Sequence, residues 1–436
     1  MKVCIVCPSI YPENLGGDGK SIYLLSRYMR QSGHYVVVVT FDSSLSLIEN
    51  RDSGRVYRFP GLVEMAAGFR PRKSGNVFVD SVRENELFWI HVASAVMSVN
   101  RKEKPDVIHW YTFSPPPAMK YLTACPQIST LNTFWVTCVK GTNVLPNGKF
   151  CSFCTYANLQ RCLSAGVPPY GQIPAGHLPF IRAKILLWER KYIANGMDKI
   201  ITLSYATKNL VQRNGISPSK IEVIPNMYDP QFLKMVDFYS KEPREKVRRD
   251  LGLNSDSFVV SYIGRIVSEK GVGYLLESIP SILRRFPRTC FAFAGKGPET
   301  AKLVNQANHL KVRPNVIFTG LLDTDSLAKL YSISDLIVAP QIIFEAFGRS
   351  ILEAMLASKP VITTNVGAPK EFVSHKKTGI VIPACDSNAI AEWTIKLLED
   401  NELRQTLGAN ARIYAESMFS PEIVLQKIEC LYRSVL

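Results

Sequence analysis

The sequence predicts an α/β chain that folds into two doubly wound domains, each built on a parallel sheet. Its 436 residues exceed what one ordinary hydrophobic core organises. Short apolar runs, most of them continuous, alternate with amphipathic helical patterns along the whole chain. Continuous apolar strands are typical of parallel sheets buried on both faces, and their alternation with helices predicts doubly wound sheets.

The first domain is expected to span residues 1–228. The start of the chain is interpreted as its first strand, since the apolar run is too short for a signal peptide and ends in Pro8 and Pro12. The strands predicted for this domain are residues 2–9, 35–41, 106–111, 127–132, 199–204 and 221–226.

The second domain is expected to span residues 229–412, after a seam in which Pro225, Pro230 and Pro243 interrupt regular structure. Its clearest helix is predicted over 272–286, where the apolar residues fall on one stripe. Its predicted strands are residues 258–265, 290–297, 316–322, 336–341, 360–367 and 379–383. Residues 413–436 are expected to form a last helix.

The composition favours an anionic partner without selecting one. Lys and Arg number 52 against 37 Asp and Glu, which gives a formal charge of +15. Nucleic acid is not the predicted partner, because the cations are dispersed and no recognisable nucleic-acid module is present. We find no apolar stretch of transmembrane length in the sequence.

Ligands of doubly wound sheets bind beyond the carboxyl ends of the strands, so the motifs at strand ends are the candidate sites. In "YIGRIVSEKG" a strand ends at Gly264, and Arg265 and Lys270 precede the clear helix. Two cations at the mouth of a sheet suit a diphosphate. The alternative is a solvated loop with ordinary surface cations.

Two further strand exits are weaker signals. In "AGKGP", Gly295 and Gly297 either let a ligand approach the backbone or form a plain turn. In "GAPKEFV", Glu371 begins a short helix that is either part of the site or only a tight strand-to-helix turn.

"EAFGRSILEAM" places two carboxylates, Glu345 and Glu353, on either side of Gly348. A helix beginning near Gly348 would direct its first amides, with the helix dipole, at a phosphate. Glu345 would then reach a sugar hydroxyl from the loop, and Glu353 a ribose from the second turn. The alternative is that Glu353 pairs with a cation on its own helix.

The first domain carries a glycine-rich loop after its first strand, with Gly16 and Gly17 at the start of a helix. The spacing is not G-x-G-x-x-G, so a dinucleotide site is not predicted. The loop is expected to face a phosphate or an acceptor.

Five motifs in this order resemble those of the retaining glycosyltransferases of the GT-B group (group 1, family four), which includes glycogen and sucrose synthases and phosphatidylinositol mannosyltransferases. They are the Gly-Gly loop, G-R-x-x-x-x-K-G, G-x-G-P, E-x-F-G-x-x-x-x-E and G-x-P-x-E. The resemblance covers essentially the whole chain, and the motifs of the second half are the specific ones.

The resemblance implies two Rossmann-like domains that face each other across a cleft, with residues 413–436 crossing back to the first. It implies a nucleotide-diphosphate sugar in the second domain, a glycan or lipid-linked acceptor in the first, and transfer with retention of configuration. Arg265 and Lys270 would neutralise the diphosphate, and Glu345 would contact the donor sugar. The implied donor-binding set comprises Gly16, Gly17, Gly264, Arg265, Lys270, Gly295, Gly297, Phe347, Gly348, Arg349, Glu353 and Glu371. No metal or other cofactor is expected for catalysis, and "DTD" at 323–325 is interpreted as a helix cap.

The sequence departs from the family at one catalytic position. The family commonly places a His where this chain has Asn132. Asn can donate and accept hydrogen bonds but cannot act as a cation or base. Either Asn132 only orients the substrate or His109 takes part, although a lone His at a strand end is more often structural. The departure keeps a second hypothesis open, a non-catalytic protein that binds nucleotide sugars or glycans on the same fold.

A cysteine-rich insertion is predicted at about 138–162. Cys138, Cys151, Cys154 and Cys162 are spaced C-x12-C-x2-C-x7-C, and C-x2-C is a common zinc-chelating pair. A structural zinc ion is the first interpretation. Two disulfides, an iron–sulfur cluster and free thiols are the others.

Two segments combine cations with apolar side chains, "FRPRKSGN" at 69–76 and "HLPFIRAKILLWERKYIANG" at 177–196. Such a face could rest on an anionic membrane and meet a lipid-linked acceptor, or it is an ordinary packed helix. The chain is expected in the cytoplasm. If this face does rest on a membrane, the attachment is expected to be peripheral and on the inner face.

Overall fold

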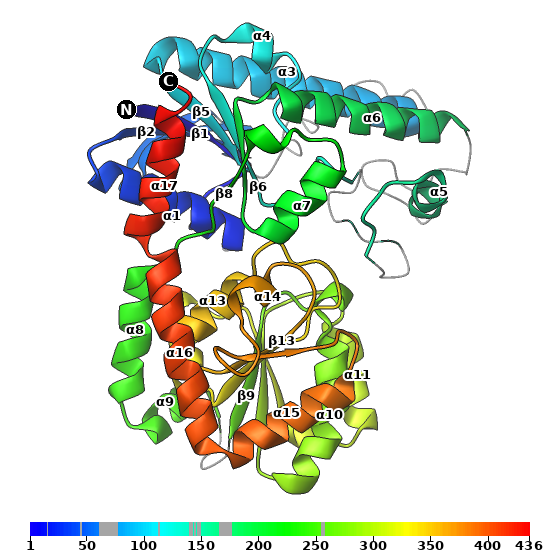
Figure 1. Cartoon of the computed structure of the whole chain (residues 1–436), viewed down its shortest axis with the longest axis vertical. Coiled ribbons are helices and arrows are strands. Elements are labelled where there is room, and N and C mark those ends of the chain that lie inside the picture. The colour runs from blue at the N-terminus through cyan, green and yellow to red at the C-terminus, as the bar shows by residue number, and fades with distance from the viewer. Residues whose placement is uncertain are drawn as a thin grey trace. The chain divides into compact units, whose positions relative to one another are not determined.

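The computed structural model describes residues 1–14, 16–43, 46–60, 77–111, 114–138, 143, 145, 150–164, 177–253 and 258–436 (Figure 1). They form two compact units. Unit 1 consists of Met1–Met227 and Pro421–Leu436, and unit 2 of Tyr228–Ser420. The chain returns to unit 1 at Pro421, later than the predicted residue 413. The reason is that α16 (Asn401–Phe419) runs on to Phe419 before Pro421, which cannot continue a helix, starts the next one.

Unit 1 is built on an eight-stranded sheet in the order β3-β4-β2-β1-β5-β6-β7-β8. The six predicted strands are confirmed as β1 (Lys2–Val6), β2 (Tyr35–Ser43), β5 (Val107–Tyr111), β6 (Gln127–Leu131), β7 (Lys199–Thr202) and β8 (Ile221–Val223). All pair in parallel, as their continuous apolar runs predicted. The hairpin of β3 (Leu47–Arg51) and β4 (Gly54–Pro60) was not predicted, and its two strands pair antiparallel at one edge.

Helices cover both faces of this sheet and bury two separate cores. The helices of unit 1 are α1 (Gly17–Gln31), α3 (Val77–Glu103), α4 (Met119–Leu122), α5 (Tyr156–Ser164), α6 (His177–Gly196), α7 (Tyr205–Arg213) and α17 (Pro421–Arg433). The last helix, α17, packs with α1 against one face, where Val424, Leu425 and Ile428 join the core of β1 and β2.

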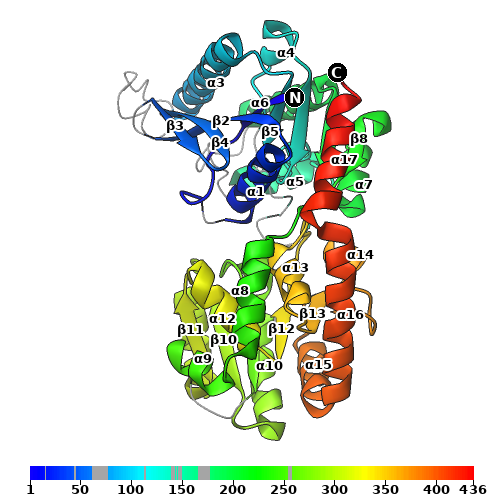
Figure 2. The ribbon, with the colours of Figure 1, turned by 90° about the vertical axis from the view of Figure 1, so that its left-hand side faces the viewer.

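Unit 2 is built on a six-stranded, wholly parallel sheet in the order β11-β10-β9-β12-β13-β14, part of which can be followed in Figure 2. The strands are β9 (Val259–Ile263), β10 (Cys290–Ala294), β11 (Val316–Gly320), β12 (Leu336–Ala339), β13 (Val361–Thr364) and β14 (Ile380–Ile382). All six lie where the sequence predicted them. The strand order is that of a doubly wound Rossmann sheet, with the reversal between β9 and β12.

The helices of unit 2 are α8 (Pro230–Lys241), α9 (Arg244–Asp250), α10 (Val272–Arg285), α11 (Thr300–His309), α12 (Thr324–Ile333), α13 (Arg349–Leu356), α14 (Pro369–Phe372), α15 (Ser387–Glu399) and α16. The clear stripe predicted for 272–286 is buried in the main core with β9 and β10. Asp323 caps α12 by accepting from the amide of Ser326 at 2.8 Å, so "DTD" forms the predicted cap.

Within the described parts of the chain, no helix combines the length and the apolar character needed to cross a membrane.

Candidate active site

The site of unit 2 lies at the point where its strand order reverses. The loops that follow β9 and β12 leave neighbouring parallel strands at the same sheet edge. Such a switch point opens a crevice beyond the carboxyl ends of the strands. The two most specific sequence motifs, at 264–271 and 345–353, occupy these two loops.

Lys270 and Glu345 meet across this switch point. Lys270 ends the short turn after β9, Glu345 lies on the loop after β12, and the Lys270 ammonium forms an ion pair and hydrogen bond with Glu345 Oε2. Both side chains remain partly exposed, at 26 % and 21 %. A cation and a carboxylate thus stand together, open to a ligand, as expected for residues that bind the charged and the hydroxyl-bearing parts of one molecule.

The loop that carries Glu345 is held from the next strand. The hydroxyl of Thr364 donates to the carbonyl of Gln341 at 2.6 Å, and the amide of Ala368 donates to the carbonyl of Glu345 at 2.8 Å. Gly367 has a φ of +75°, and a Cβ there would lie 2.4 Å from the Glu345 carbonyl oxygen. Glycine is therefore required at 367 because the backbone of Glu345 occupies the space of a side chain.

The helix α13 begins directly after this loop. Its N-cap is Gly348, with a φ of +89°, a conformation that favours glycine. In this described stretch the N-cap provides no side-chain cap, and Arg349 is the first helical residue. The helix begins where the sequence predicted it, and anion binding by its first amides and helix dipole stays a prediction.

Glu353 lies on the second turn of α13 and is 9 % exposed. Its Oε2 accepts a hydrogen bond from the hydroxyl of Tyr331, at 3.1 Å. Tyr331 is fully buried on α12, and burial together with the Glu353 charge raises its pKa well above the ordinary value, so it stays a donor. Tyr331 was missed by sequence reasoning, since an apolar-face tyrosine on a helix gives no signal of its partner.

The remaining cation of the motif, Arg265, is 70 % exposed and lies 3.7 Å from Glu269. The backbone at this position is fixed by Tyr262, whose hydroxyl donates to the Arg265 carbonyl at 2.6 Å. The backbone of Arg265 is therefore fixed, whereas its exposed side chain can turn toward a ligand. Glu371 is exposed on α14. The pKa of Tyr414 is raised first by the burial of Tyr414 itself and then by the charge of Glu371.

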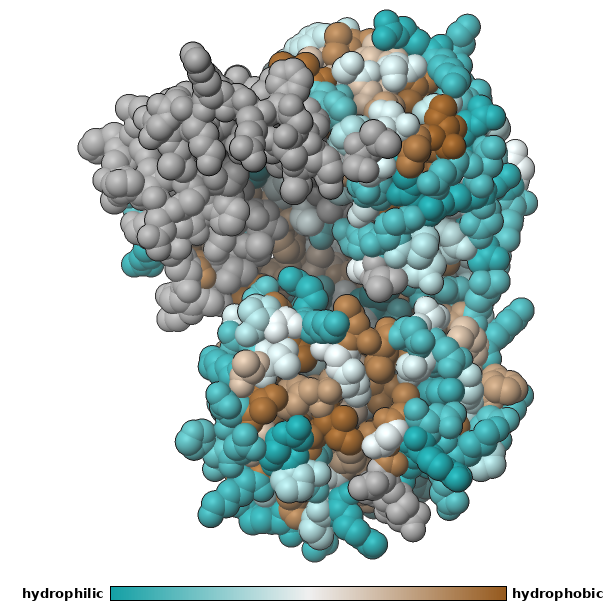
Figure 3. Space-filling model, turned by 180° about the vertical axis from the view of Figure 1, so that it is seen from behind, coloured by the Kyte–Doolittle hydropathy of each residue, from teal (hydrophilic) through white to brown (hydrophobic). Residues whose placement is uncertain are grey.

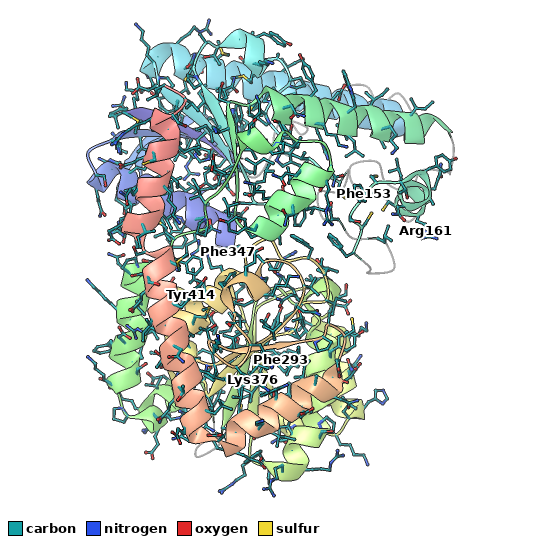
Figure 4. The ribbon with its side chains drawn as sticks, viewed as in Figure 1. Phe153, Arg161, Phe293, Phe347, Lys376 and Tyr414 are labelled. Carbon is teal, nitrogen blue, oxygen red and sulfur yellow. The ribbon has the colours of Figure 1, made fainter. Side chains whose placement is uncertain are left out.

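Phe347 is not placed to touch a ligand with its ring, which corrects the prediction. Phe347, labelled in Figure 4, is 4 % exposed. Its ring lies 5.6 Å from that of Phe372 and 5.7 Å from that of Phe419. These rings form a buried cluster under the loop. Phe347 thus anchors the Glu345–Gly348 loop to the core.

The glycines of the other strand ends face backbone. A Cβ on Gly295 would lie 1.9 Å from the carbonyl oxygen of Gly264, and one on Gly297 would lie 1.9 Å from that of Ile266. These close approaches explain the residue type at 295 and 297 without a ligand. Gly264 directly follows β9 at the switch point.

In unit 1, Gly16 and Gly17 are exposed at the start of α1, at the carboxyl end of β1. The loop before them is braced by Glu13, which forms ion pairs with Arg51 (2.7 Å) and the buried Arg58 (3.0 Å). Burial of Glu13 raises its pKa, but hydrogen bonding from Arg51 and the charge of Arg58 outweigh this and lower it to about 2. The unpredicted hairpin β3–β4 supplies both arginines and therefore helps to hold this loop in place.

His109 does not take part in a site, and the prediction that it could is wrong. Its ring is 0 % exposed in the middle of β5. Nδ1 is 2.6 Å from the hydroxyl of Tyr432, on α17, and Nε2 is 2.7 Å from that of Thr130. Burial lowers the pKa of His109 to about 3, so the ring is neutral. It ties the last helix to the sheet.

Asn132 follows β6 at the carboxyl edge of the first sheet and is half-buried. Among the described residues, its Oδ1 is buried without a hydrogen-bond partner. This placement agrees with a residue that orients a substrate, the role that its chemistry leaves open.

The four clustered cysteines form no disulfide, and each is partly exposed. Burial raises the pKa of Cys154 to about 12, with further increases from Cys138, Cys151 and Cys162 and a decrease from Lys184. The four are therefore electrostatic neighbours. No three His, Cys, Asp or Glu side chains of the described residues are arranged to hold a metal ion, so zinc stays a prediction.

Two family profiles match the chain. "Glycosyltransferase Family 4" matches residues 15–232, and "Glycosyl transferases group 1" matches residues 243–414. An uncharacterized glycosyltransferase of Methanocaldococcus jannaschii is 30 % identical over 438 residues, which cover 99 % of this chain and 98 % of that protein. A GDP-mannose-dependent alpha-(1-6)-phosphatidylinositol monomannoside mannosyltransferase of Mycobacterium tuberculosis is 27 % identical over 54 % of this chain and 62 % of its own length.

Solved structures share the fold over the full length. HepE of Anabaena, in complex with UDP, superimposes with a TM-score of 0.69 at 19 % identity and full coverage of both chains. The sucrose-phosphate synthase of Thermosynechococcus elongatus gives a TM-score of 0.70 at 20 % identity, covering 99 % of this chain and 98 % of that one.

Proposed function

This chain belongs to the group 1, family 4 glycosyltransferases, and from that premise we propose that it transfers a sugar, with retention of configuration, from a nucleotide-diphosphate sugar to a glycan or lipid-linked acceptor. One observation carries the proposal: Lys270 and Glu345 meet at the switch point of unit 2, in front of the open start of α13. The UDP found with HepE is consistent with a nucleotide donor.

In the proposed reaction, Lys270, Arg265 and the first amides of α13 stabilise the negative charge that develops on the leaving diphosphate. Glu353, oriented by Tyr331, binds the ribose hydroxyls, and Glu345 binds the donor sugar. The bond between the anomeric carbon and the phosphate oxygen breaks, and its electron pair stays on the diphosphate. The acceptor hydroxyl attacks from the same face, and its proton passes to that phosphate oxygen. Catalysis is then mostly positioning and charge stabilisation, and requires no metal.

A ligand screen tests this proposal directly. Nucleoside diphosphates and their sugar conjugates should raise the thermal midpoint of the purified chain, because a ligand that binds the native state stabilises it. The preferred sugar conjugate should then be turned over, and proton NMR of the product should show the donor's anomeric configuration. Inversion would contradict retention, and binding without turnover would favour the non-catalytic alternative.

We further propose that Cys138, Cys151, Cys154 and Cys162 hold a structural zinc ion. Their spacing includes a C-x2-C pair, and all four lie near one another around α5. Metal binding by the four thiolates would supply folding free energy to this segment.

A further inference from the structure

The helix α6 exposes a continuous apolar stripe. Ile181, Ile185, Trp188 and Tyr192 are 52 %, 42 %, 66 % and 45 % exposed, and their spacing of four, three and four residues places them on one face. The opposite face, with Ala183, Leu186 and Leu187, is buried against α5. Helices of globular proteins usually expose a polar face, so a face of this kind indicates contact with an apolar phase or partner.

An apolar pocket of about 550 Å³ opens beside this stripe. Its lining comes from α3, from the loop after β5 and from α4, and includes Trp89, Ala93, Met97, Pro116 and Leu122. This volume is typical of small-molecule sites, but those usually contain several fixed polar groups. A lining that is almost wholly apolar suits a hydrocarbon chain better than a sugar or nucleotide.

The stripe and the pocket form one surface. The hydroxyl groups of Tyr121, on α4, and Tyr192, on α6, are hydrogen-bonded to each other, and the neighbouring Leu122 lines the pocket. Trp89 lines the pocket from α3 and packs on the buried face of α6, opposite the stripe, so it joins the pocket to the helix, and the two tyrosines join it to the stripe. Figure 1 shows α3, α4 and α6 together in unit 1. The side turned away from the viewer of Figure 1 is mostly hydrophilic with scattered apolar residues, as Figure 3 shows. We call this surface the α3–α6 face.

Cations border the α3–α6 face. The Lys120 ammonium lies 5.8 Å from the ring centre of Tyr192, and Arg101 is exposed one helical turn beyond Met97. Of the cations of α6, Lys184 donates to the carbonyl of Cys154 and Arg190 to those of Trp135 and Cys138, so the border consists of Lys120 and Arg101. Apolar side chains with interfacial Trp and Tyr and a basic border complement an anionic lipid surface.

We propose that the α3–α6 face rests on an anionic lipid bilayer and that its pocket takes the hydrocarbon chain of a lipid-linked acceptor. The part of this inference that concerns the acceptor rests on the proposed function. It selects the lipid-linked acceptor over the glycan. Docking would hold the acceptor-binding unit at the membrane, and the pocket would draw one chain out of the bilayer, leaving the headgroup hydroxyl in water for transfer.

Vesicle flotation of the full chain tests the docking step. The protein should float with phosphatidylcholine vesicles that contain phosphatidylglycerol, less so at high salt, and little with phosphatidylcholine alone. The double variant Ile185→Ser/Trp188→Ser should reduce the bound fraction about tenfold or more, because two apolar side chains no longer enter the interface. The matched control is Phe238→Ser/Ile413→Ser, which removes exposed apolar residues of unit 2 and should change nothing. Equal flotation of the two double variants would overturn the docking proposal.

A fluorescent chain probe, dansyl-undecanoic acid, tests the pocket. It should bind the wild type, and Ser94→Trp should abolish binding, since Ser94 is an exposed pocket-lining residue and the larger ring fills the space. Ser417→Trp, an exposed serine of α16, is the control and should bind like the wild type. Binding of the probe that is unchanged in Ser94→Trp would overturn the pocket assignment.

Nucleotide binding separates this inference from the proposed function. A chain that binds and turns over a nucleotide sugar but neither floats nor binds the probe would overturn the inference and leave the function standing. A chain that floats and binds the probe but binds no nucleotide sugar would overturn the function and leave the lipid surface.

Discussion

Lys270 and Glu345, which lie 75 positions apart in the sequence, form an ion pair across the switch point of the second sheet. In the proposed donor complex the ammonium would also face the diphosphate, and Glu345 would turn to the sugar hydroxyls. The pair thus keeps the cation in place before the donor arrives, and the partial exposure of both side chains leaves room for the exchange.

Removal of either member of this pair should abolish most of the activity while the protein stays folded. We expect Lys270→Ala and Glu345→Gln each to reduce kcat about 10²–10³-fold, the usual cost of losing one charge-stabilising contact in a transition state. The measurement is the release of nucleoside diphosphate at saturating donor, with circular dichroism to check the fold. Lys302→Ala is the control, since Lys302 forms an exposed ion pair with Glu299 in the same unit. Activity near the wild-type level in Lys270→Ala would contradict the assigned site.

Tyr331→Phe should weaken donor binding without changing the chemistry. The variant leaves Glu353 without its hydrogen bond, and a bond to a charged group contributes about 1.5–3 kcal/mol. We expect an increase in the Kd for the nucleoside diphosphate of about tenfold, by calorimetry, with kcat little changed. Glu353→Gln should weaken binding in the same way. If Tyr331→Phe has no effect in a Glu353→Gln background, the tyrosine acts through Glu353.

Gly367→Ala should displace Glu345, because the new Cβ would collide with the Glu345 carbonyl oxygen. We expect a loss of about 1–3 kcal/mol in the free energy of unfolding, together with a lower kcat. Gly273→Ala is the matched control: it lies within α10 and a Cβ there meets nothing within 4 Å. That substitution should stabilise by about 0.4–1 kcal/mol. A fully active Gly367→Ala enzyme would show that Glu345 tolerates displacement.

The stability of the chain should fall in mild acid through His109. Its folded-state pKa, about 3, lies below the ordinary value of 6.5, so the unfolded chain binds a proton that the folded chain does not. The contribution of neutral His109 to the free energy of unfolding is therefore constant above about pH 6.5. It is lost progressively as the pH falls toward 3. Between pH 6.5 and about pH 5 this costs about 2 kcal/mol. Urea unfolding at both pH values should show a smaller acid loss in His109→Gln than in the wild type.

Purified protein should contain one zinc ion per chain. Chelation should release it, expose reactive thiols and lower the thermal midpoint, because metal binding is coupled to folding of the loop. Cys154→Ser should reduce the zinc content, whereas Cys430→Ser, on the exposed side of α17, should not. Four thiols paired as disulfides in metal-free protein would contradict the zinc proposal.

The strands could be predicted because buried parallel strands carry continuous apolar runs, as in "VVVV" of β2. The hairpin β3–β4 escaped prediction because "LIENR" and "GRVYRFP" intersperse charges with apolar residues. Arg58 of β4 pairs with Glu49 of β3 within the hairpin and with Asp42 and Glu13 outside it. Sequence spacing cannot reveal such partners.

The candidate site was predictable where a motif follows a strand. It was less predictable where burial determines whether a side chain faces a ligand or the core. The loops of Lys270 and Glu345 meet because β9 and β12 are neighbours in the sheet, an order that the structure gives and that agrees with the predicted doubly wound class. The roles of Phe347 and His109 depend on which way the side chains point. Both point into the core, and sequence spacing does not distinguish a motif residue that packs from one that binds a ligand.

The assignment of α17 to unit 1 affects how the chain is made. Unit 2 is one uninterrupted segment, whereas unit 1 needs both termini, since Tyr432 closes over His109 and α17 completes the core on β1. On the ribosome, unit 2 has all its residues before unit 1 does. The half that is synthesised first therefore waits for the last helix to emerge, and a truncated message that stops before Pro421 yields a product whose opening strands stay uncovered.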